Sequence, residues 1–345
     1  MRFITLLVFS VFLLPFHLLS QYDDLLRNPD ITWLAEYTAD YELNPVYNDI
    51  LDEEYNLLNV VRLENSGNVN GLYTDAEVSN WMSVFILDGL TKGAFDCYVD
   101  EQLRQGVPSG QLQRLLSRPD TTPSFDHPGE NIVSINEVRA EEIVLFRARQ
   151  VLFYDISKRM LNARLLALAP VLAEYDEEGN VIGYQPLVWI KTPVLSSKVA
   201  KKLVKEANYV VQTRMKENAP DLNQVKAVKG GFDPQRWAYG EATRPSRQNL
   251  SADTFDPLSA YGLQALVFTN DTIVRLNDEG GAEIDRIIQN DATRRVEKIR
   301  FVQNWYIDER RRVFDCRVVA AAPLAAVRDS EGNFRYYKPL FYVRY

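Results

Sequence analysis

The chain has 345 residues, of which 46% are hydrophobic, and a formal net charge of −8 at pH 7. A chain of this size can bury one large core or two modest ones, and its many Tyr and Phe residues favour β-sheets. An acidic chain repels phosphate backbones, so the composition argues against nucleic-acid binding. Two cysteines, Cys97 and Cys316, are too few for a disulfide framework and are either one bridge or two free thiols.

The first twenty residues have the pattern of a secretion signal. Arg2 precedes an apolar run over residues 3–14, and the small residue Ser20 stands before polar Gln21. We expect cleavage after Ser20. An uncleaved membrane anchor is the alternative, but the apolar run is shorter than the roughly 20 residues of a spanning helix. No cysteine that could carry a lipid lies near the cut, so we expect a soluble mature chain that docks at most on membrane-bound partners.

A helix is predicted from Thr74 to about Leu90. The segment Thr74-Asp75-Ala76-Glu77 forms a capping box, in which the Thr hydroxyl and the Glu carboxylate accept hydrogen bonds from amides that the first turn leaves open. Apolar residues then follow on one stripe that can pack on a sheet, namely Val78, Trp81, Met82, Phe85 and Leu90. A strand is expected over residues 94–99, after Gly93.

An internal repeat is the most informative feature of the sequence. The segment Leu152–Ile190 aligns without a gap with Trp305–Val343, at a constant spacing of 153 residues and with about a third of the positions identical. Each copy alternates apolar and polar residues with a period of two, and a turn (DEEGN or DSEGN) closes a hairpin. We therefore predict the same antiparallel β-meander twice, with Pro323 at an edge or a bend because it has no amide hydrogen.

A second helix is predicted over about residues 197–216, between the two meanders. Its inward stripe consists of Val199, Leu203, Ala207 and Val210, and its outer face carries Lys198, Lys201, Lys202 and Lys205. Residues 218–261 are rich in Gly, Pro, Ser, Asp and Arg and show no sustained period, so they are predicted to form an irregular linker.

The predicted fold class is α+β, with two related antiparallel β-meander units and packed helices joined by a long polar connection. The signal takes residues 1–20. The first unit takes residues 21–217, with its meander at about 143–190, and the second meander unit takes residues 262–345 after the linker.

Residue patterns for catalysis or metal binding are not found in the mature sequence. His127, in a polar loop, is its only histidine, so neither a common zinc site nor a His-dependent nucleophile is supported, and no catalytic residue, metal or cofactor is predicted. Acidic runs such as Asp176-Glu177-Glu178 could serve a carboxylate-dependent hydrolase, but adjacent acids in turns are commonly solvated. The DEEGN and DSEGN turns also lack the complete calcium-loop pattern.

Three sets of residues are candidates for binding a partner. Arg164 and Arg317 stand at the same place in both meanders, and each could hold a partner's carboxylate or form an internal cross-strand ion pair. The lysine face of the second helix could contact an acidic partner or lipid head groups, or only solvent. Trp237 and Tyr239 could line a cleft for a peptide or glycan.

The second copy resembles the GldN/PorN family in KIRFVQNWYID (Lys298–Asp308), in Ala322-Pro323, in Glu331-Gly332-Asn333 and in Tyr337–Phe341. The first copy is similar in Leu152–Ile190, as are the RLE, WMSVF and KGAFD segments between Asn59 and Val99. The chain departs from the family pattern by ending just after the second meander and by WIKTPVL at residues 189–195. A standard ring subunit and a divergent paralogue therefore both remain open.

The resemblance implies a non-enzymatic structural subunit of the type IX secretion and gliding machinery of Bacteroidota. It implies a periplasmic location at the outer membrane, where the subunit forms a homo- or hetero-oligomeric ring with a GldK/PorK-type lipoprotein and couples to the periplasmic part of an inner-membrane motor. The alternatives are a periplasmic peptide- or glycan-binding module and a carboxylate-dependent hydrolase.

Overall fold

The structure of the chain is a computed structural model that describes residues 21–43, 57–62, 81–123, 131–176, 178–195, 197–206, 209–214, 225–254, 256–276 and 282–345. The predicted signal segment, the capping box at Thr74–Glu77 and His127 lie outside these residues. Within them, no helix is long and apolar enough to cross a membrane.

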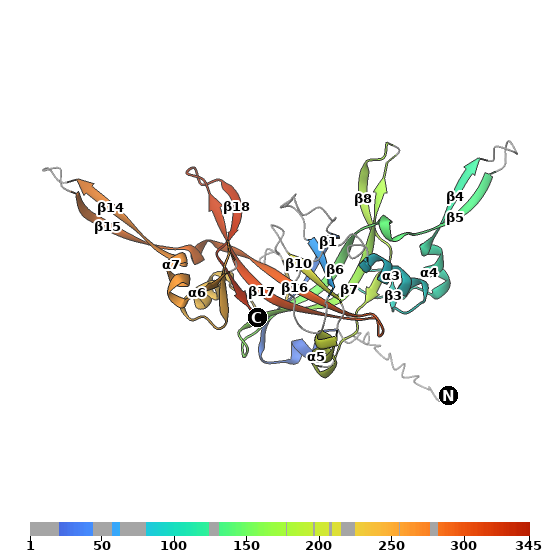
Figure 1. Cartoon of the computed structure of the whole chain (residues 1–345), viewed down its shortest axis with the longest axis horizontal. Helices are drawn as coiled ribbons and strands as arrows, with labels where there is room; N and C mark the ends of the chain where they lie inside the picture. Colours follow the sequence, from blue (N-terminus) through green and yellow to red (C-terminus); the bar gives the residue numbers. More distant parts are fainter. Residues whose placement is uncertain are drawn as a thin grey trace, which may run out of the picture.

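Fifteen strands of the described residues join in one mainly antiparallel sheet, which confirms the α+β class (Figure 1). Its strands in chain order are β1 (Ile31–Leu43), β2 (Leu57–Arg62), β3 (Cys97–Tyr98), β6 (Ile143–Asp155), β7 (Met160–Tyr175), β8 (Val181–Pro186), β9 (Trp189–Lys191), β10 (Tyr209–Arg214), β11 (Lys226–Lys229), β12 (Gln248–Ser251), β13 (Pro257–Leu258), β16 (Val296–Asp308), β17 (Val313–Arg328), β18 (Phe334–Pro339) and β19 (Phe341–Arg344). They lie in the order β13-β12-β19-β17-β16-β10-β2-β1-β6-β7-β9-β3, with β8, β11 and β18 paired to β7, β1 and β17.

The helices lie around this sheet, and two further hairpins extend from it. The helices are α1 (Asp23–Arg27), α3 (Trp81–Thr91), α4 (Ser109–Leu116), α5 (Ser197–Glu206), α6 (Pro234–Thr243) and α7 (Ala260–Val267), with short 3-10 turns η1 (Ala140–Glu142) and η2 (Ala292–Arg295). The hairpins are β4 (Ser117–Pro123) with β5 (Asn131–Glu137) and β14 (Phe268–Leu276) with β15 (Ala282–Asp291).

The predicted meander is present twice with the same boundaries. Adding 153 to the bounds of β6, β7 and β8 gives the bounds of β16, β17 and β18, and β9 corresponds to β19 within one residue. The hairpin turns also match, because Gly179 and Gly332 adopt φ values of 85° and 86°, which favour glycine. Asp176 and Asp329 each accept hydrogen bonds from two backbone amides of their turns. The DEEGN and DSEGN segments are therefore hairpin turns.

The duplication extends well beyond the meanders. The same spacing relates α3 to α6, α4 to α7, the β4–β5 hairpin to the β14–β15 hairpin and η1 to η2, within two residues at most boundaries. The prediction of an irregular linker over residues 218–261 is therefore wrong. Asp233 caps α6 by accepting hydrogen bonds from the amides of Gln235 and Arg236, and Pro234 stands at the first turn, so part of the polar composition belongs to a helix start.

The helix predicted over about 197–216 is wrong in its second half. α5 ends at Glu206, and Tyr209–Arg214 form β10, which pairs with β16 on one side and β2 on the other. The run Tyr209-Val210-Val211 is rich in aromatic and β-branched residues that favour a strand. Residues 209–214 therefore form a strand because they can pair with β16 and β2 on their two sides.

α3 starts at Trp81 in the described residues and runs to Thr91. Its inner face buries Met82, Phe85, Ile86 and Leu90, close to the predicted stripe. The strand predicted over residues 94–99 is reduced to β3, which covers only Cys97 and Tyr98.

Pro170 and Pro323 lie within long inner strands, where a proline normally costs a ladder hydrogen bond. At each proline the neighbouring strand changes, from β9 to β8 in the first copy and from β19 to β18 in the second. The carbonyls of Pro170 and Pro323 accept from the amides of Leu187 and Leu340. In an antiparallel strand the N–H and C=O of one residue point to the same side, so the missing amide faces this junction. The sequence predicts an edge or a bend for Pro323. Each proline instead lies on an inner strand, at the gap between the two short strands that pair with it in succession.

Two glutamines at the same place in the two copies meet in the core. Gln150 and Gln303 are both fully buried, and Nε2 of Gln303 donates to Oε1 of Gln150 at 2.8 Å. A residue contacts its own counterpart only where it lies near the axis that relates the copies. An approximate twofold axis therefore passes beside these glutamines.

The glutamine pair belongs to a buried hydrogen-bond network. Gln150 Nε2 donates to the hydroxyl of Tyr41 at 3.0 Å, and Trp305 Nε1 donates to Oε1 of Gln303 at 3.0 Å. The rings of Tyr41 and Trp305 meet edge to face, with centroids 5.2 Å apart. Burial raises the pKa of the Tyr41 hydroxyl well above its usual value, so this group stays neutral. One continuous apolar cluster surrounds the network and draws residues from both copies.

A pair of arginines crosses between the copies in a reciprocal way. Arg159, in the turn after β6, reaches α6 of the second copy, where Nη2 lies 3.3 Å from Oε1 of buried Glu241. Arg312, its counterpart after β16, reaches α3 of the first copy and pairs with Asp88, the counterpart of Glu241. Both arginines adopt left-handed φ values, 48° and 50°. Gly89 permits the second contact, because a Cβ there would lie 2.7 Å from Nη1 of Arg312.

The N-terminal strand β1 breaks the symmetry. β2 and β10 occupy the same place in the two copies and pair with each other. The pairing itself is symmetric: Leu57 pairs with Arg214, and their counterparts at the repeat spacing, Val210 and Val61, also pair with each other. However, β6 pairs with β1, whereas its counterpart β16 pairs with β10. β1 therefore occupies on β6 the position of β10 on β16, and it separates β2 from β6.

We predict that Gln150→Leu destabilises the protein by about 2 kcal/mol, because the amide of Gln303 loses its acceptor in a buried site. Chemical denaturation of the wild-type and variant chains at pH 7 measures the loss. Gln111→Leu, at an exposed position of α4, is the matched control and should change stability by no more than about 0.5 kcal/mol. Equal stability of Gln150→Leu and the wild type would show that the two copies do not meet at these residues.

Arg159→Ala should cost about 3 kcal/mol of unfolding free energy, because it leaves the buried carboxylate of Glu241 without its cation. Arg139, whose ion pair with Glu142 is exposed, supplies the control, and Arg139→Ala should cost less than about 1 kcal/mol. Both values come from the same denaturation curves. A cost for Arg159→Ala no larger than that of the control would contradict the crossing contact.

Candidate functional site

A cavity of about 630 Å³ lies where the two copies meet, next to α1 and α5. Its walls come from α1, from the ends of β6 and β16, from β7 and β17, and from the segment that leads into α5. Both predicted arginines, Arg164 on β7 and Arg317 on β17, line it, so the structure brings these two candidates into one site. Figure 1 shows α1 and α5 together below the sheet.

Arg164 holds the N-terminal segment of the described chain. Its Nη1 and Nη2 donate to the two carboxylate oxygens of Asp24 at 2.6 and 2.8 Å, and Nη1 also donates to the carbonyl of Gln21 at 2.9 Å. The side chain of Gln21 donates to the carbonyls of Leu166 and Thr192. The hydrogen bond from Arg164 lowers the pKa of Asp24. Arg164 therefore forms an internal ion pair, which is one of its two interpretations. Its partner is Asp24 of α1, however, and not a residue on a neighbouring strand.

Arg317 makes a different contact. Its Nε donates to Oδ2 of Asp315, two residues earlier on β17, at 2.9 Å. The first copy has Asn162 at the place of Asp315. Nη1 and Nη2 of Arg317 have no hydrogen-bond or ion-pair partner in the described part of the chain, and 36% of the side chain is exposed.

The rest of the cavity combines a further ion pair with apolar walls. Lys158 Nζ lies 2.6 Å from Oδ2 of Asp155, and the pKa of Asp155 is lowered by its hydrogen bonds to Lys158 and Ser157, although burial alone would raise it. The apolar walls are formed by Phe153, Tyr306, Phe314, Leu195 and Tyr345, among others. Asp24 and Asp155 are thus held as anions beside cations.

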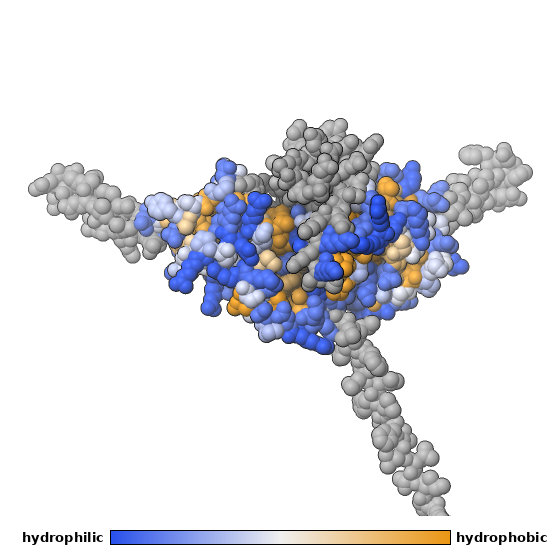
Figure 2. Space-filling model, turned by 60° about the horizontal axis from the view of Figure 1, so that its bottom comes forward, coloured by the Kyte–Doolittle hydropathy of each residue, from blue (hydrophilic) through white to orange (hydrophobic). Residues whose placement is uncertain are grey.

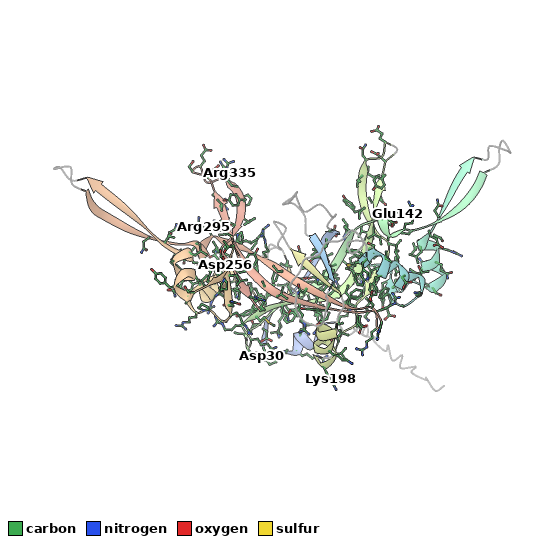
Figure 3. The ribbon with its side chains drawn as sticks, in the orientation of Figure 1. Asp30, Glu142, Lys198, Asp256, Arg295 and Arg335 are labelled. Atoms are coloured by element: carbon green, nitrogen blue, oxygen red, sulfur yellow. The ribbon has the colours of Figure 1, made fainter. Side chains whose placement is uncertain are left out.

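The two lysines of α5 whose side chains the structure describes do not line the cavity. Lys198 and Lys202 are exposed, and Lys198 points away from the sheet (Figure 3), while Ala200 and Leu203 are buried. The side chains of Lys201 and Lys205 lie outside the described residues. Ala200 is the residue of α5 that contributes to the cavity wall among those whose side chains are described.

Trp237 and Tyr239 do not form a cleft. Trp237 is buried in the main core beside Phe232, whereas Tyr239 is half exposed and packs edge to face on Phe268. Two residues apart on a helix, their side chains point to nearly opposite sides. The prediction of an aromatic-lined site at this pair is wrong.

Cys97 and Cys316 are free and buried, so the bridge between them is not formed. Burial raises the pKa of the Cys97 thiol to about 11 and raises that of Cys316 well above its usual value. Among the described residues, no group of three or more His, Cys, Asp or Glu side chains is placed to hold a metal ion.

A comparison with known protein families identifies the family of this chain. The chain matches the family described as gliding motility associated protein GldN over residues 56–223 and 248–345. It belongs to the GldN family. The matched ranges cover both meanders, including Arg164 and Arg317, so the resemblance drawn from the sequence is confirmed. No curated protein matches the chain.

Several residues that join the two copies of this GldN protein were missed in the sequence. The pairs Gln150 with Gln303 and Arg159 with Arg312 are identical at the repeat spacing, which is a signal for a shared role. Asp88 and Glu241 share that spacing and an acidic side chain, but their neighbours in α3 and α6 differ throughout. The repeat therefore indicates the glutamine and arginine pairs, but it gives almost no indication of the pair Asp88 and Glu241.

Asp24→Asn should lower stability by at most about 1 kcal/mol at pH 7, because the ion pair with Arg164 is partly exposed and screened by solvent. The folded pKa of Asp24 lies below its unfolded value, so this contribution is complete above about pH 5 and disappears as the pH falls through the folded pKa. Urea unfolding from pH 7 down to pH 2.5 measures the difference between the two chains. A difference that persists at the lowest pH would contradict the assignment to this carboxylate.

Proposed function

We propose that this protein is a non-enzymatic structural subunit of the type IX secretion and gliding machinery. In this proposal it forms part of a periplasmic ring together with an outer-membrane lipoprotein of the GldK/PorK type and contacts the periplasmic part of an inner-membrane motor. The family match over both copies carries the proposal, since the family is associated with gliding motility.

The shape of the molecule supports an assembly role. Four hairpins, two from each copy, extend from the same side of the sheet: β4–β5, β7–β8, β14–β15 and β17–β18 (Figure 1). The lower face, turned forward in Figure 2, is mainly hydrophilic with small separate apolar patches. Extended hairpins give a subunit several separate places at which neighbours can pair with strand edges.

The β7–β8 hairpin carries apolar side chains in solvent. Ile182 is 67% exposed, Tyr175 is 59% exposed and Tyr184 is 48% exposed. The counterpart hairpin β17–β18 exposes Phe334 and Tyr336. Exposed aromatic and aliphatic residues on a projecting hairpin are typical of a surface that a partner covers.

The charge state of the cavity argues against a carboxylate-dependent hydrolase. A general acid of that kind needs a carboxyl whose pKa is raised toward neutrality. Asp24 and Asp155 show the opposite shift, because each is hydrogen bonded to a cationic side chain. The binding-module alternative loses its site because Trp237 lies in the core.

The proposal is tested by affinity purification of the tagged mature chain from detergent-solubilised envelope, with mass spectrometry of the bound proteins. The wild type should recover an outer-membrane lipoprotein. The double variant Ile182→Ser/Tyr184→Ser should recover about tenfold less, since an apolar contact at an interface centre contributes more than 1.4 kcal/mol.

Tyr261→Ser provides the matched control, because Tyr261 is 83% exposed but lies on α7, on the opposite side of the molecule from the β7–β8 hairpin (Figure 1). It should recover partners like the wild type, and all variants should melt at the same temperature. Absence of any lipoprotein in the wild-type sample would refute the ring proposal. Full recovery by the double variant would exclude the β7–β8 hairpin as the contact.

A further inference from the structure

The twofold relation of the copies makes Arg164 a template for Arg317. In the first copy Nη1 and Nη2 of Arg164 grip both oxygens of Asp24. In the second copy the same two nitrogens of Arg317 have no hydrogen-bond or ion-pair partner among the described residues, although Arg317 lines the same cavity. One half of the site is therefore filled by the chain itself, and in the other half Nη1 and Nη2 of Arg317 have no partner among the described residues.

The difference follows from the order of the chain. α1 precedes the first copy, and within the described residues no counterpart of it places a second Asp24 at Arg317. The hydrogen bond to Asp315 uses Nε of Arg317 and leaves the donors of Nη1 and Nη2 available. A planar fork of two N–H donors matches a carboxylate in a bidentate geometry.

The cavity has the size and walls for more than a single ion. A volume of about 630 Å³ lies in the range of ligand-binding sites. The second copy contributes Tyr306, Phe314 and Val319 to the walls of the cavity, and these side chains can cover apolar atoms of a ligand. In the first copy, Leu25 follows Asp24 directly and is buried in a small apolar cluster with Phe153, the counterpart of Tyr306.

We propose that Arg317 and its half of the cavity bind an acidic peptide segment of a partner protein, whose carboxylate takes the position on Arg317 that Asp24 takes on Arg164. This inference rests on the proposed function, since it names the chemistry of one partner contact of an assembly subunit. An acidic side chain followed by an apolar residue is the recognised pattern. A polyanion fits less well, because Asp24, Asp155 and Asp315 also line the cavity.

The probe is a synthetic peptide with the sequence of residues 21–28, acetyl-QYDDLLRN-amide, which carries the acidic-apolar pattern of α1. Isothermal titration against the complete mature chain should show binding. Arg317→Gln should raise Kd by about tenfold or more, as expected for the loss of a charge-assisted bidentate contact. A control peptide, QYDNLLRN, in which Asn replaces the residue that corresponds to Asp24, should bind the wild-type chain with a Kd raised by the same factor.

Arg335→Gln is the matched control, since it removes the same charge from the exposed β17–β18 hairpin, where Arg335 pairs with Asp329 (Figure 3). It should bind the peptide like the wild type. Arg317→Lys keeps the charge without the fork and should also weaken binding, which preserves the test if Arg317→Gln fails to fold. Equal affinity of wild type and Arg317→Lys, equal affinity of both peptides, or no binding by the wild type would each overturn the proposal.

Envelope purification separates this inference from the proposed function. If the wild type recovers the lipoprotein and the peptide does not bind, the ring proposal stands and the Arg317 site falls. If the peptide binds through Arg317 and no lipoprotein is recovered, the site stands and the ring proposal falls.

Discussion

The contact between Gln150 and Gln303 is the constraint on which the rest of the structure depends. Two buried amides that satisfy each other hold the copies in one relative position, because any sliding would leave a polar group unpaired in the core. The crossing arginines Arg159 and Arg312 act at the periphery of the same arrangement, and each pairs with a carboxylate on a helix of the other copy. The two copies are consequently one folding unit with a shared core, organised like the two subunits of a symmetric dimer.

This arrangement also explains the cavity. Arg164 and Arg317 come together because β7 and β17 are counterparts that lie close to each other near the axis. The walls of the cavity are therefore supplied in nearly matched pairs, such as Phe153 with Tyr306 and Arg164 with Arg317. Among the described residues α1 lies on one side only, so Arg164 binds Asp24 while Nη1 and Nη2 of Arg317 keep their donors.

The meanders could be predicted closely from the sequence because the repeat has no gaps. The same turns and prolines recur in both copies, so each copy confirms the strand boundaries of the other. It failed for the linker over residues 218–261, since α3 and α6 share a position but no identical residue over Trp81–Thr91, so the repeat signal is lost there. It failed for β10 because a strand that completes a sheet is chosen by its neighbours, which local periodicity does not record. The arginine pair was found, but the partner of Arg164 depends on a helix 140 residues away.

The insertion of β1 has a consequence for how such a protein can evolve and assemble. Two separate identical subunits must accept every substitution on both sides of their axis, whereas fused copies can change one at a time. With β1 inserted between β2 and β6, whereas β10 pairs directly with β16, the two halves of the sheet and their flanks are no longer interchangeable. A building block with distinguishable flanks can join head to tail with a fixed direction, which two identical flanks cannot specify.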